Sequence, residues 1–182
     1  MEINIIRSNR KTLGLEIKDG QVTVRAPLRA SRAQIDSFIS EHRGWIEKHL
    51  EKYEAQEQQV REEGLLSAEE IRALASEAAK VIPERVRFYA SLVGVTYGRI
   101  TVRNQRTKWG SCSAKGNLNF NCLLMLAPPQ VLDSVVVHEL CHRKEMNHSD
   151  RFYREVYRVF PEYDRWRRWL RENGPALMMR MG

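Results

Sequence analysis

The stretch VVVHELCHRKEMNHSDRF, residues 135–152, combines the signals of a buried helix with those of a metal site. Its apolar start predicts a buried helix, yet it carries three histidines and two glutamates. His138 and His142 are four residues apart, so on a helix both imidazoles lie on one face and can reach one metal ion. Glu139 lies about 100° round the helix, where it can contact a water molecule bound to that ion. The H-E-x-x-H pattern therefore predicts a metal site on a buried helix.

A tetrahedral zinc site needs a further protein ligand, and the nearby candidates are Glu145 and His148. Three ligands in line on a straight helix would be spread over about 10 Å, too far for bonds of about 2 Å. The helix therefore has to end before the third ligand. Asn147 adopts a left-handed conformation readily, and a helix end there would fold His148 back toward the metal. We expect His138, His142 and His148 to be the ligands, with water in the fourth position.

A catalytic metal explains this pattern better than chance or a structural zinc site does. A chance H-E-x-x-H has a probability of about one in a hundred in such a chain, and the third histidine lowers it further. Structural zinc sites usually have four protein ligands, most of them cysteines, and no fourth ligand is evident here. At a catalytic site, zinc lowers the pKa of its bound water toward ~7, and Glu139 takes the water's proton and later delivers it to the leaving group. An all-imidazole site also takes nickel, cobalt, copper or iron.

Charge and cysteine content narrow the class of protein. The 182 residues carry a formal net charge of +7, but 23 acidic residues are interspersed, so nucleic acid is only weakly favoured as a partner. The three cysteines include no C-x-x-C pair, which favours a reducing compartment. The sequence has no signal-peptide pattern and no run of eighteen apolar residues, so we expect a cytoplasmic protein with no membrane partner.

The order of predicted elements indicates an α+β fold with two parts. Strands are predicted in residues 3–7, 13–18 and 21–26, with a hairpin turn at Asp19-Gly20, and a helical arm begins after Ser31. The polar segment 51–64 marks a boundary, so residues 1–64 form an N-terminal β-hairpin region with a helical arm. Residues 65–182 form the metal-dependent hydrolase core, and the two parts are expected to make one integrated domain.

The predicted core combines helices with a small sheet. A helix capped by Ser67 should kink or break near Pro83, and strands are predicted at 99–104 and 117–126. The metal-bearing helix follows Pro128-Pro129, and two helices come after it, around 150–158 and 162–172. The aromatic and basic run 157–173 could bind nucleic acid, but its aromatics are expected to pack against the metal-bearing helix.

Two stretches, RNQRTKWGSCSAKGNLNFNCLLMLAP (103–128) and VVVHELCHRKEMNHSDRF (135–152), resemble the YgjP-like metallopeptidase-domain family. That family is grouped with zincin-type peptidases and with the SprT and WLM domains. The resemblance implies a zincin-like half, in which an active-site helix lies beside a small sheet and zinc is bound at His138, His142 and His148. The spacing also equals that of the metzincins, but Glu145 stands where they have glycine and no Met-turn follows.

The resemblance leaves the substrate open. Zincin membership implies a peptide substrate, and the strand predicted at 117–126 would offer an edge to which an extended peptide could pair. YgjP-like proteins are also described as UTP pyrophosphatases, which implies a nucleotide substrate at the same metal centre. We expect a zinc-dependent hydrolase with a metallopeptidase-type site. The alternatives are a nucleoside triphosphate pyrophosphatase and a non-catalytic DNA- or protein-binding module.

Six residues upstream of the motif are candidates for substrate binding: Arg103, Arg106, Lys108, Trp109, Asn119 and Asn121. The three cations and the tryptophan would suit a triphosphate and a stacked base, or would be ordinary in a solvated loop. The two asparagines share one face of the predicted strand, where they could bond a substrate or face water.

Overall fold

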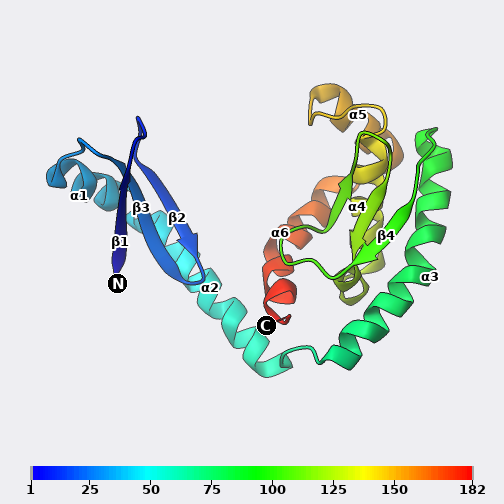
Figure 1. The fold of residues 1–182 in the computed structure, drawn as a ribbon, viewed down its shortest axis with the longest axis horizontal. Helices are drawn as coiled ribbons and strands as arrows, with labels where there is room; N and C mark the ends of the chain where they lie inside the picture. The colour runs from blue at the N-terminus through cyan, green and yellow to red at the C-terminus, as the bar shows by residue number, and fades with distance from the viewer. Residues whose placement is uncertain (1, 182) are drawn as a thin grey trace. The chain divides into compact units, whose positions relative to one another are not determined.

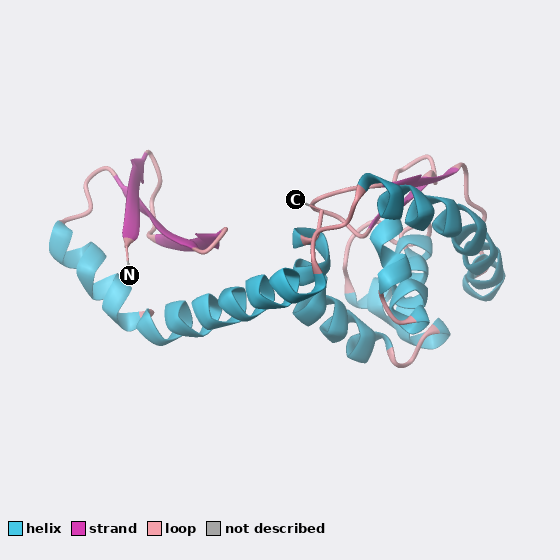
Figure 2. Ribbon diagram, turned by 90° about the horizontal axis from the view of Figure 1, so that it is seen from below, coloured by secondary structure: helices cyan, strands magenta, loops and turns pink. Residues whose placement is uncertain are grey.

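The computed structural model describes residues 2–181 and has an α+β architecture, as predicted. The chain divides into two compact units, one ending at Glu62 and the other beginning at Glu63. Each unit contains one three-stranded sheet together with helices (Figure 1 and Figure 2). In the part of the chain described, no helix is both long and apolar enough to cross a membrane.

The first unit is a small sheet followed by two helices. Its elements are β1 (Ile3–Ser8), β2 (Gly14–Lys18), β3 (Gln21–Pro27), α1 (Arg32–Glu41) and α2 (Arg43–Glu63), the last of which ends at the boundary. The strand order is β1-β3-β2, with β1 parallel and β2 antiparallel to β3. The predicted hairpin turn is confirmed, because Asp19 and Gly20 have φ values of 49° and 72°, as a tight turn of this kind requires. Ser31 caps α1, as predicted.

The second unit packs a short sheet against its helices. Its elements are α3 (Ala68–Val93), β4 (Ile100–Arg103), β5 (Gly110–Cys112), β6 (Leu118–Asn121), the 3-10 helix η1 (Cys122–Leu126), α4 (Pro129–Cys141), α5 (Asp150–Val159) and α6 (Tyr163–Met179). The strand order is β4-β6-β5, with β4 parallel and β5 antiparallel to β6. Helix α4 contacts β5 on the sheet side and α3, α5 and α6 on its other sides (Figure 1).

Helix α4 is the centre of this unit because nearly every residue from Val131 to Cys141 is buried. Among them, Asp133 forms a bidentate ion pair with Arg85 of α3, with nitrogen–oxygen distances of 2.5 and 2.6 Å. Pairing of this kind offsets the cost of burying a charge. The pair therefore fixes α4 against α3.

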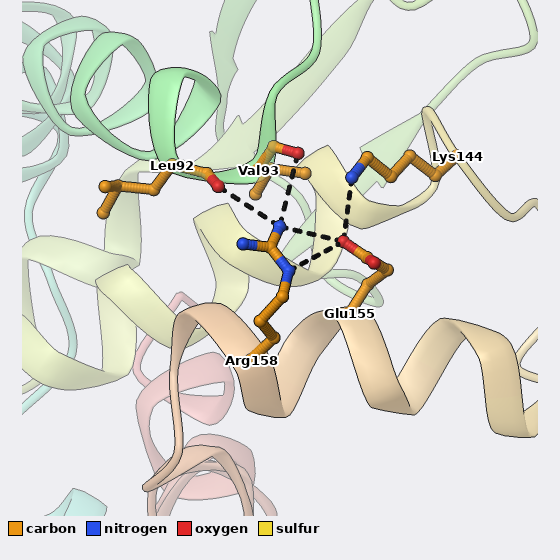
Figure 3. A network of polar contacts seen from close by, with 5 residues as sticks. All are labelled: Leu92, Val93, Lys144, Glu155 and Arg158. Carbon is orange, nitrogen blue, oxygen red and sulfur yellow. Dashed lines mark hydrogen bonds and ion pairs between the residues drawn. The ribbon is translucent and has the colours of Figure 1, made fainter.

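Helix α5 is attached to α3 by a polar network (Figure 3). The Arg158 guanidinium donates to the carbonyls of Leu92 and Val93, at 3.2 and 3.4 Å, at the end of α3. The same guanidinium and the Lys144 ammonium both donate to Oε2 of Glu155, each at 2.9 Å. The network joins α3, α5 and the turn after α4.

Two predicted element ends differ from the structure. Helix α3 runs through Pro83 without the predicted break, since Ile82 and Val86 on either side are fully buried and their packing offsets the lost hydrogen bond. A kink at Pro83 stays a prediction. The strand predicted at 117–126 ends at Asn121, because the Asn121 side chain accepts from the Leu123 amide at 3.1 Å and starts a 3-10 turn.

The end of the last helix also differs from the prediction. Helix α6 continues past Gly174 and Pro175 to Met179, whereas residues 162–172 were expected. Ala176 and Leu177 are buried, and the Leu66 amide donates to the Arg180 carbonyl at 2.7 Å. Tertiary contacts therefore stabilise a turn of helix that the Gly-Pro pair disfavours.

Candidate active site

The three histidines of the motif come from the end of α4 and the turn that follows. His138 lies in the last turn of α4, and His142 is the residue that caps its C-terminus. The chain then forms a turn that is closed by two backbone hydrogen bonds: the Arg143 amide donates to the Leu140 carbonyl and the Glu145 amide donates to the Cys141 carbonyl. This turn returns His148 to the helix end.

The predicted left-handed break at Asn147 is wrong. Over residues 2–181, Asp19 is the sole non-glycine residue with positive φ. The helix instead ends earlier, at Cys141, and the hydrogen-bonded turn after it reverses the direction of the chain. The next helix begins as expected, because the Ser149 hydroxyl accepts from the Phe152 amide at 3.4 Å and caps α5.

The three imidazoles converge on one point. Nε2 of His138 lies 3.2 Å from Nε2 of His142 and 3.0 Å from Nε2 of His148, and the ligand atoms of all three lie within 4.8 Å of one another. Two nitrogens bound to one tetrahedral zinc ion are separated by about 3.3 Å. No carboxylate or thiolate of residues 2–181 joins the group. The three histidines could therefore bind one metal ion, and the side chain of Glu145 is not part of the cluster.

Hydrogen bonds on the outer ring nitrogens orient two of these imidazoles. Nδ1 of His142 lies 3.1 Å from the Glu145 carbonyl, which can only accept, so Nδ1 carries the proton and Nε2 presents a lone pair. Nδ1 of His138 lies 2.7 Å from the Tyr163 hydroxyl. Lone pairs facing one another at about 3 Å repel, and a cation between them removes that repulsion. The chemistry of the donor set thus fits a metal ion.

Burial keeps the first two imidazoles in the form that binds metals. Burial, together with the neighbouring His142 and His148, lowers the pKa of His138 to about 3. The pKa of His142 is also lowered, mainly by burial. Neutral imidazole is the ligand form, so protons compete little with a metal ion at neutral pH.

Glu139 lies beside the cluster and is buried. Glu139 is only 6% exposed. This burial raises the pKa of its carboxyl to about 7, although the nearby charge of Lys108 lowers that pKa. Strand β5 approaches it closely, because a β-carbon at position 110 would lie 2.7 Å from Oε1 of Glu139. Glycine at position 110 therefore makes room for the carboxylate.

A cavity of about 290 Å³ opens beside this carboxylate. Its walls come from α4, α6 and the segment leading into β5, and its lining residues are Thr107, Lys108, Trp109, Gly110, Ser134, Val135, His138, Glu139, Tyr163, Arg167 and Leu170. Of the predicted substrate-binding residues, Lys108 and Trp109 line the cavity, whereas Arg103 and Arg106 are exposed and do not.

The two asparagines occupy different environments. The Asn119 side chain is half-buried and donates to the Ser111 hydroxyl at 3.2 Å. Asn121 is fully buried, and its amide donates to the carbonyls of Gln105 and Lys108 at 2.6 and 3.1 Å. The expectation that Asn121 contacts a substrate or faces water is therefore corrected, because its hydrogen bonds hold the loop that precedes β5.

The predicted peptide-binding edge is also corrected. The strand β6 is central in its sheet and has partners on both sides, so it offers no free edge. The strand at the edge next to α4 is β5, which carries Gly110. Sequence reasoning missed Gly110 and Tyr163. A glycine inside a predicted loop gave a weak signal for the first, and nothing local gave one for the second.

The second unit thus combines a buried helix that carries H-E-x-x-H, a converging third histidine and an adjoining small sheet, an arrangement that could bind a metal ion. The chain belongs to the YgjP-like family, since the family model described as YgjP-like, metallopeptidase domain, matches residues 11–74 and 65–173. A comparison with curated proteins gave no match.

Two crystal structures of archaeal metallopeptidase zymogens are similar to about half of this chain. Abylysin of Pyrococcus abyssi is 23% identical, with 51% of this chain and 98% of that chain covered and a TM-score of 0.45. Jannalysin of Methanocaldococcus jannaschii is 22% identical, with coverage of 50% and 94% and a TM-score of 0.45.

Proposed function

We propose that this protein is a zinc-dependent peptidase in which His138, His142 and His148 hold the metal ion and Glu139 is the general base. The observation that carries this proposal is the convergence of three Nε2 atoms beside a buried carboxylate that lines the same cavity. A zinc ion held there supplies a Lewis acid and a water molecule of lowered pKa. Nickel, cobalt, copper or iron would suit the same donor set, so the identity of the metal is part of the proposal.

Glu139 has the position and the proton affinity that a general base needs. It neighbours His138 in sequence and lines the cavity with it, so it can accept a proton from a water molecule in the cavity. Burial raises the pKa of its carboxyl to about 7, close to the pH at which a base both accepts and returns a proton efficiently. The same carboxyl can then deliver the proton to the amine leaving group.

The edge of β5 gives an extended peptide a place to bind. Among residues 2–181, the sheet order leaves β5 with β6 as its one strand partner, so its other edge is the place where a further strand would pair. An added strand gains main-chain hydrogen bonds, and pockets beside it select side chains. Because Gly110 of β5 touches Glu139, a peptide paired there would run past the base.

A nucleoside triphosphate pyrophosphatase is the second candidate. It is favoured by Lys108 and Trp109, which line the cavity and could meet a phosphate and a base. Three observations favour the peptidase over the pyrophosphatase. Arg103 and Arg106 lie outside the cavity, and the Trp109 ring packs against Gly174 of α6. The cavity of about 290 Å³ is also at the lower limit of ligand pockets.

The experiment that tests the proposal compares substrates on wild-type protein and the Glu139→Gln variant, both loaded with zinc. We expect the wild type to cleave casein or peptides, and the variant to bind as much zinc and cleave nothing. Turnover of UTP or ATP without peptide cleavage would assign the pyrophosphatase activity. Neither activity, together with salt-sensitive DNA binding, would assign a binding module.

A further inference from the structure

The cavity beside Glu139 contains two cationic side chains. Lys108 comes from the segment before β5 and Arg167 from α6, so they belong to two different walls. Within residues 2–181, neither side chain makes an ion pair, and the Arg167 guanidinium instead lies 5.9 Å from the centre of the Tyr153 ring. Arginines and lysines in a pocket without a carboxylate partner are suited to an anionic ligand.

The charge balance of the cavity is positive. Glu139 is the one acidic residue in its lining, against the two cations Lys108 and Arg167. Both cations line the same cavity as Glu139 and His138. An anion held by Lys108 and Arg167 would therefore lie next to the reacting groups.

The remaining walls are mostly apolar, with Thr107, Ser134 and His138 as polar members, and the space is small. Tyr163, Arg167 and Leu170 are spaced as one face of α6, and Val135 of α4 and Trp109 complete the walls. The volume of about 290 Å³ suits a single amino-acid residue better than a whole nucleoside triphosphate. Apolar walls with two cations favour a residue that has a short aliphatic part and a carboxylate.

We propose that this cavity binds a carboxylate of the peptide residue adjoining the scissile bond, with Lys108 and Arg167 as specificity-determining residues. The inference rests on the proposed peptidase function and adds the substrate class to it. The carboxylate can belong to an aspartate or glutamate side chain or to the C-terminus of the peptide. The first source makes the protein an endopeptidase for acidic sequences, and the second makes it a carboxypeptidase.

Cleavage of defined peptides tests the preference. The substrates are paired peptides that differ only by Glu against Gln or Asp against Asn, each made with a free and with an amidated C-terminus, and mass spectrometry locates the cuts. We expect the zinc-loaded wild type to cleave the peptide with the carboxylate at least about tenfold faster, as a charge-assisted bond implies. A preference that survives amidation identifies a side chain, and one that amidation abolishes identifies the C-terminus.

Variants of the two cations test their role. Lys108→Met and Arg167→Met keep most of the aliphatic part of the side chain and lose the charge, and we expect each to remove most of the preference by slowing the acidic peptide about tenfold relative to its neutral partner. Arg167→Lys should restore part of it. The matched controls are Lys115→Met and Arg168→Met, which change exposed cations that do not line the cavity and should leave the preference unchanged.

Binding gives a readout that does not depend on turnover. In the Glu139→Gln background, calorimetry should show that N-acetylglutamate binds and N-acetylglutamine binds about tenfold more weakly, with the difference lost in Arg167→Met. Peptide cleavage without any preference for a carboxylate would overturn the inference and leave the peptidase proposal standing. No cleavage of any peptide would overturn the peptidase proposal itself. Arg167-dependent binding of UTP in place of carboxylates would assign the cavity to phosphate and also overturn the inference.

Discussion

Tyr163 controls the orientation of the first histidine from a distant part of the chain. Its hydroxyl lies 2.7 Å from Nδ1 of His138, and the residue is only 4% exposed. Partners on the outer nitrogen of a ligating imidazole fix the ring and raise its affinity for metals. The contact links α6 directly to the face of α4 that carries His138.

Replacing this hydroxyl should weaken metal binding. We expect Tyr163→Phe to keep the fold and lower the zinc affinity about tenfold or more, measured by competition with a chromophoric chelator. Tyr157→Phe is the matched control, because the Tyr157 hydroxyl bonds to Asp164 and to none of the three histidines, and its loss should leave the affinity unchanged. Equal affinities in both variants would show that Tyr163 does not support the site.

Residue-level prediction from the sequence succeeded where the chemistry is local. The spacing of His138 and His142 on one helix, with Glu139 between them, required only helical geometry. The place of His148 required the additional inference that the helix ends, and that inference gave the right convergence with the wrong backbone conformation at Asn147. Tyr163 could not be predicted, because 25 residues and a packing contact between two helices separate it from His138.

At the scale of elements, the close packing of β5 on α4 shapes the site. We expect Gly110→Ala to leave zinc content unchanged and to lower kcat about a hundredfold, because the new methyl group would lie 2.7 Å from Oε1 of Glu139 and displace it. The measurement is peptide cleavage with parallel metal analysis. Gly44→Ala, at a position with nothing within 4 Å, is the control and should keep full activity. A wild-type kcat in Gly110→Ala would show that the close approach of β5 to Glu139 does not affect activity.

The network that joins α3 and α5 should make stability depend on pH. Hydrogen bonds from Lys144 and Arg158 lower the pKa of Glu155, so its carboxylate stabilises the folded state above the pKa of the unfolded chain, and this contribution is lost as pH falls through the folded-state value. We expect Glu155→Gln to lower the free energy of unfolding by about 1 kcal/mol at pH 7. Denaturant unfolding at pH 7 and pH 3 measures the difference, which should be smaller at pH 3 than at pH 7. A difference of the same size at both pH values would have another cause.

Element boundaries were predictable from capping residues and turns but less so from helix breakers. Ser31 and Ser67 start their helices as expected, since a cap acts on the amides next to it. Pro83 and Pro175 do not end theirs, because buried neighbours on both sides contribute more than the proline costs. The end of β6 could not be predicted, because it depends on the Asn121 side chain, whose hydrogen-bond partners lie in the loop before β5.

At the scale of the whole molecule, the candidate site belongs entirely to the unit that begins at Glu63. We predict that a fragment of residues 63–182 folds and binds one zinc ion as the full chain does. Its start is anchored within the unit, since the Arg180 guanidinium donates to the carboxylate of Glu63 and to the Gly64 carbonyl, at 2.8 and 3.1 Å. Circular dichroism and metal analysis check this. An unfolded fragment would show that the first unit is needed for folding, as one integrated domain requires.

The two-part organisation could be predicted because the polar segment 51–64 lacks the apolar stripe that a core helix needs. Its helical conformation is consistent with the i,i+4 contacts along it, such as Gln58 to Glu62 and Arg61 to Glu57. The predicted bounds, 1–64 and 65–182, and the integration of the two parts into one domain stay predictions.

The most direct test is a titration of metal-free protein with zinc while peptide cleavage is followed. The account predicts that activity rises to a plateau at one zinc ion per chain, and that Glu139→Gln binds the same single ion and stays inactive. The triple variant His138→Ala, His142→Ala, His148→Ala should neither bind zinc tightly nor cleave. Undiminished cleavage by Glu139→Gln, or a tight zinc ion retained by the triple variant, would contradict it.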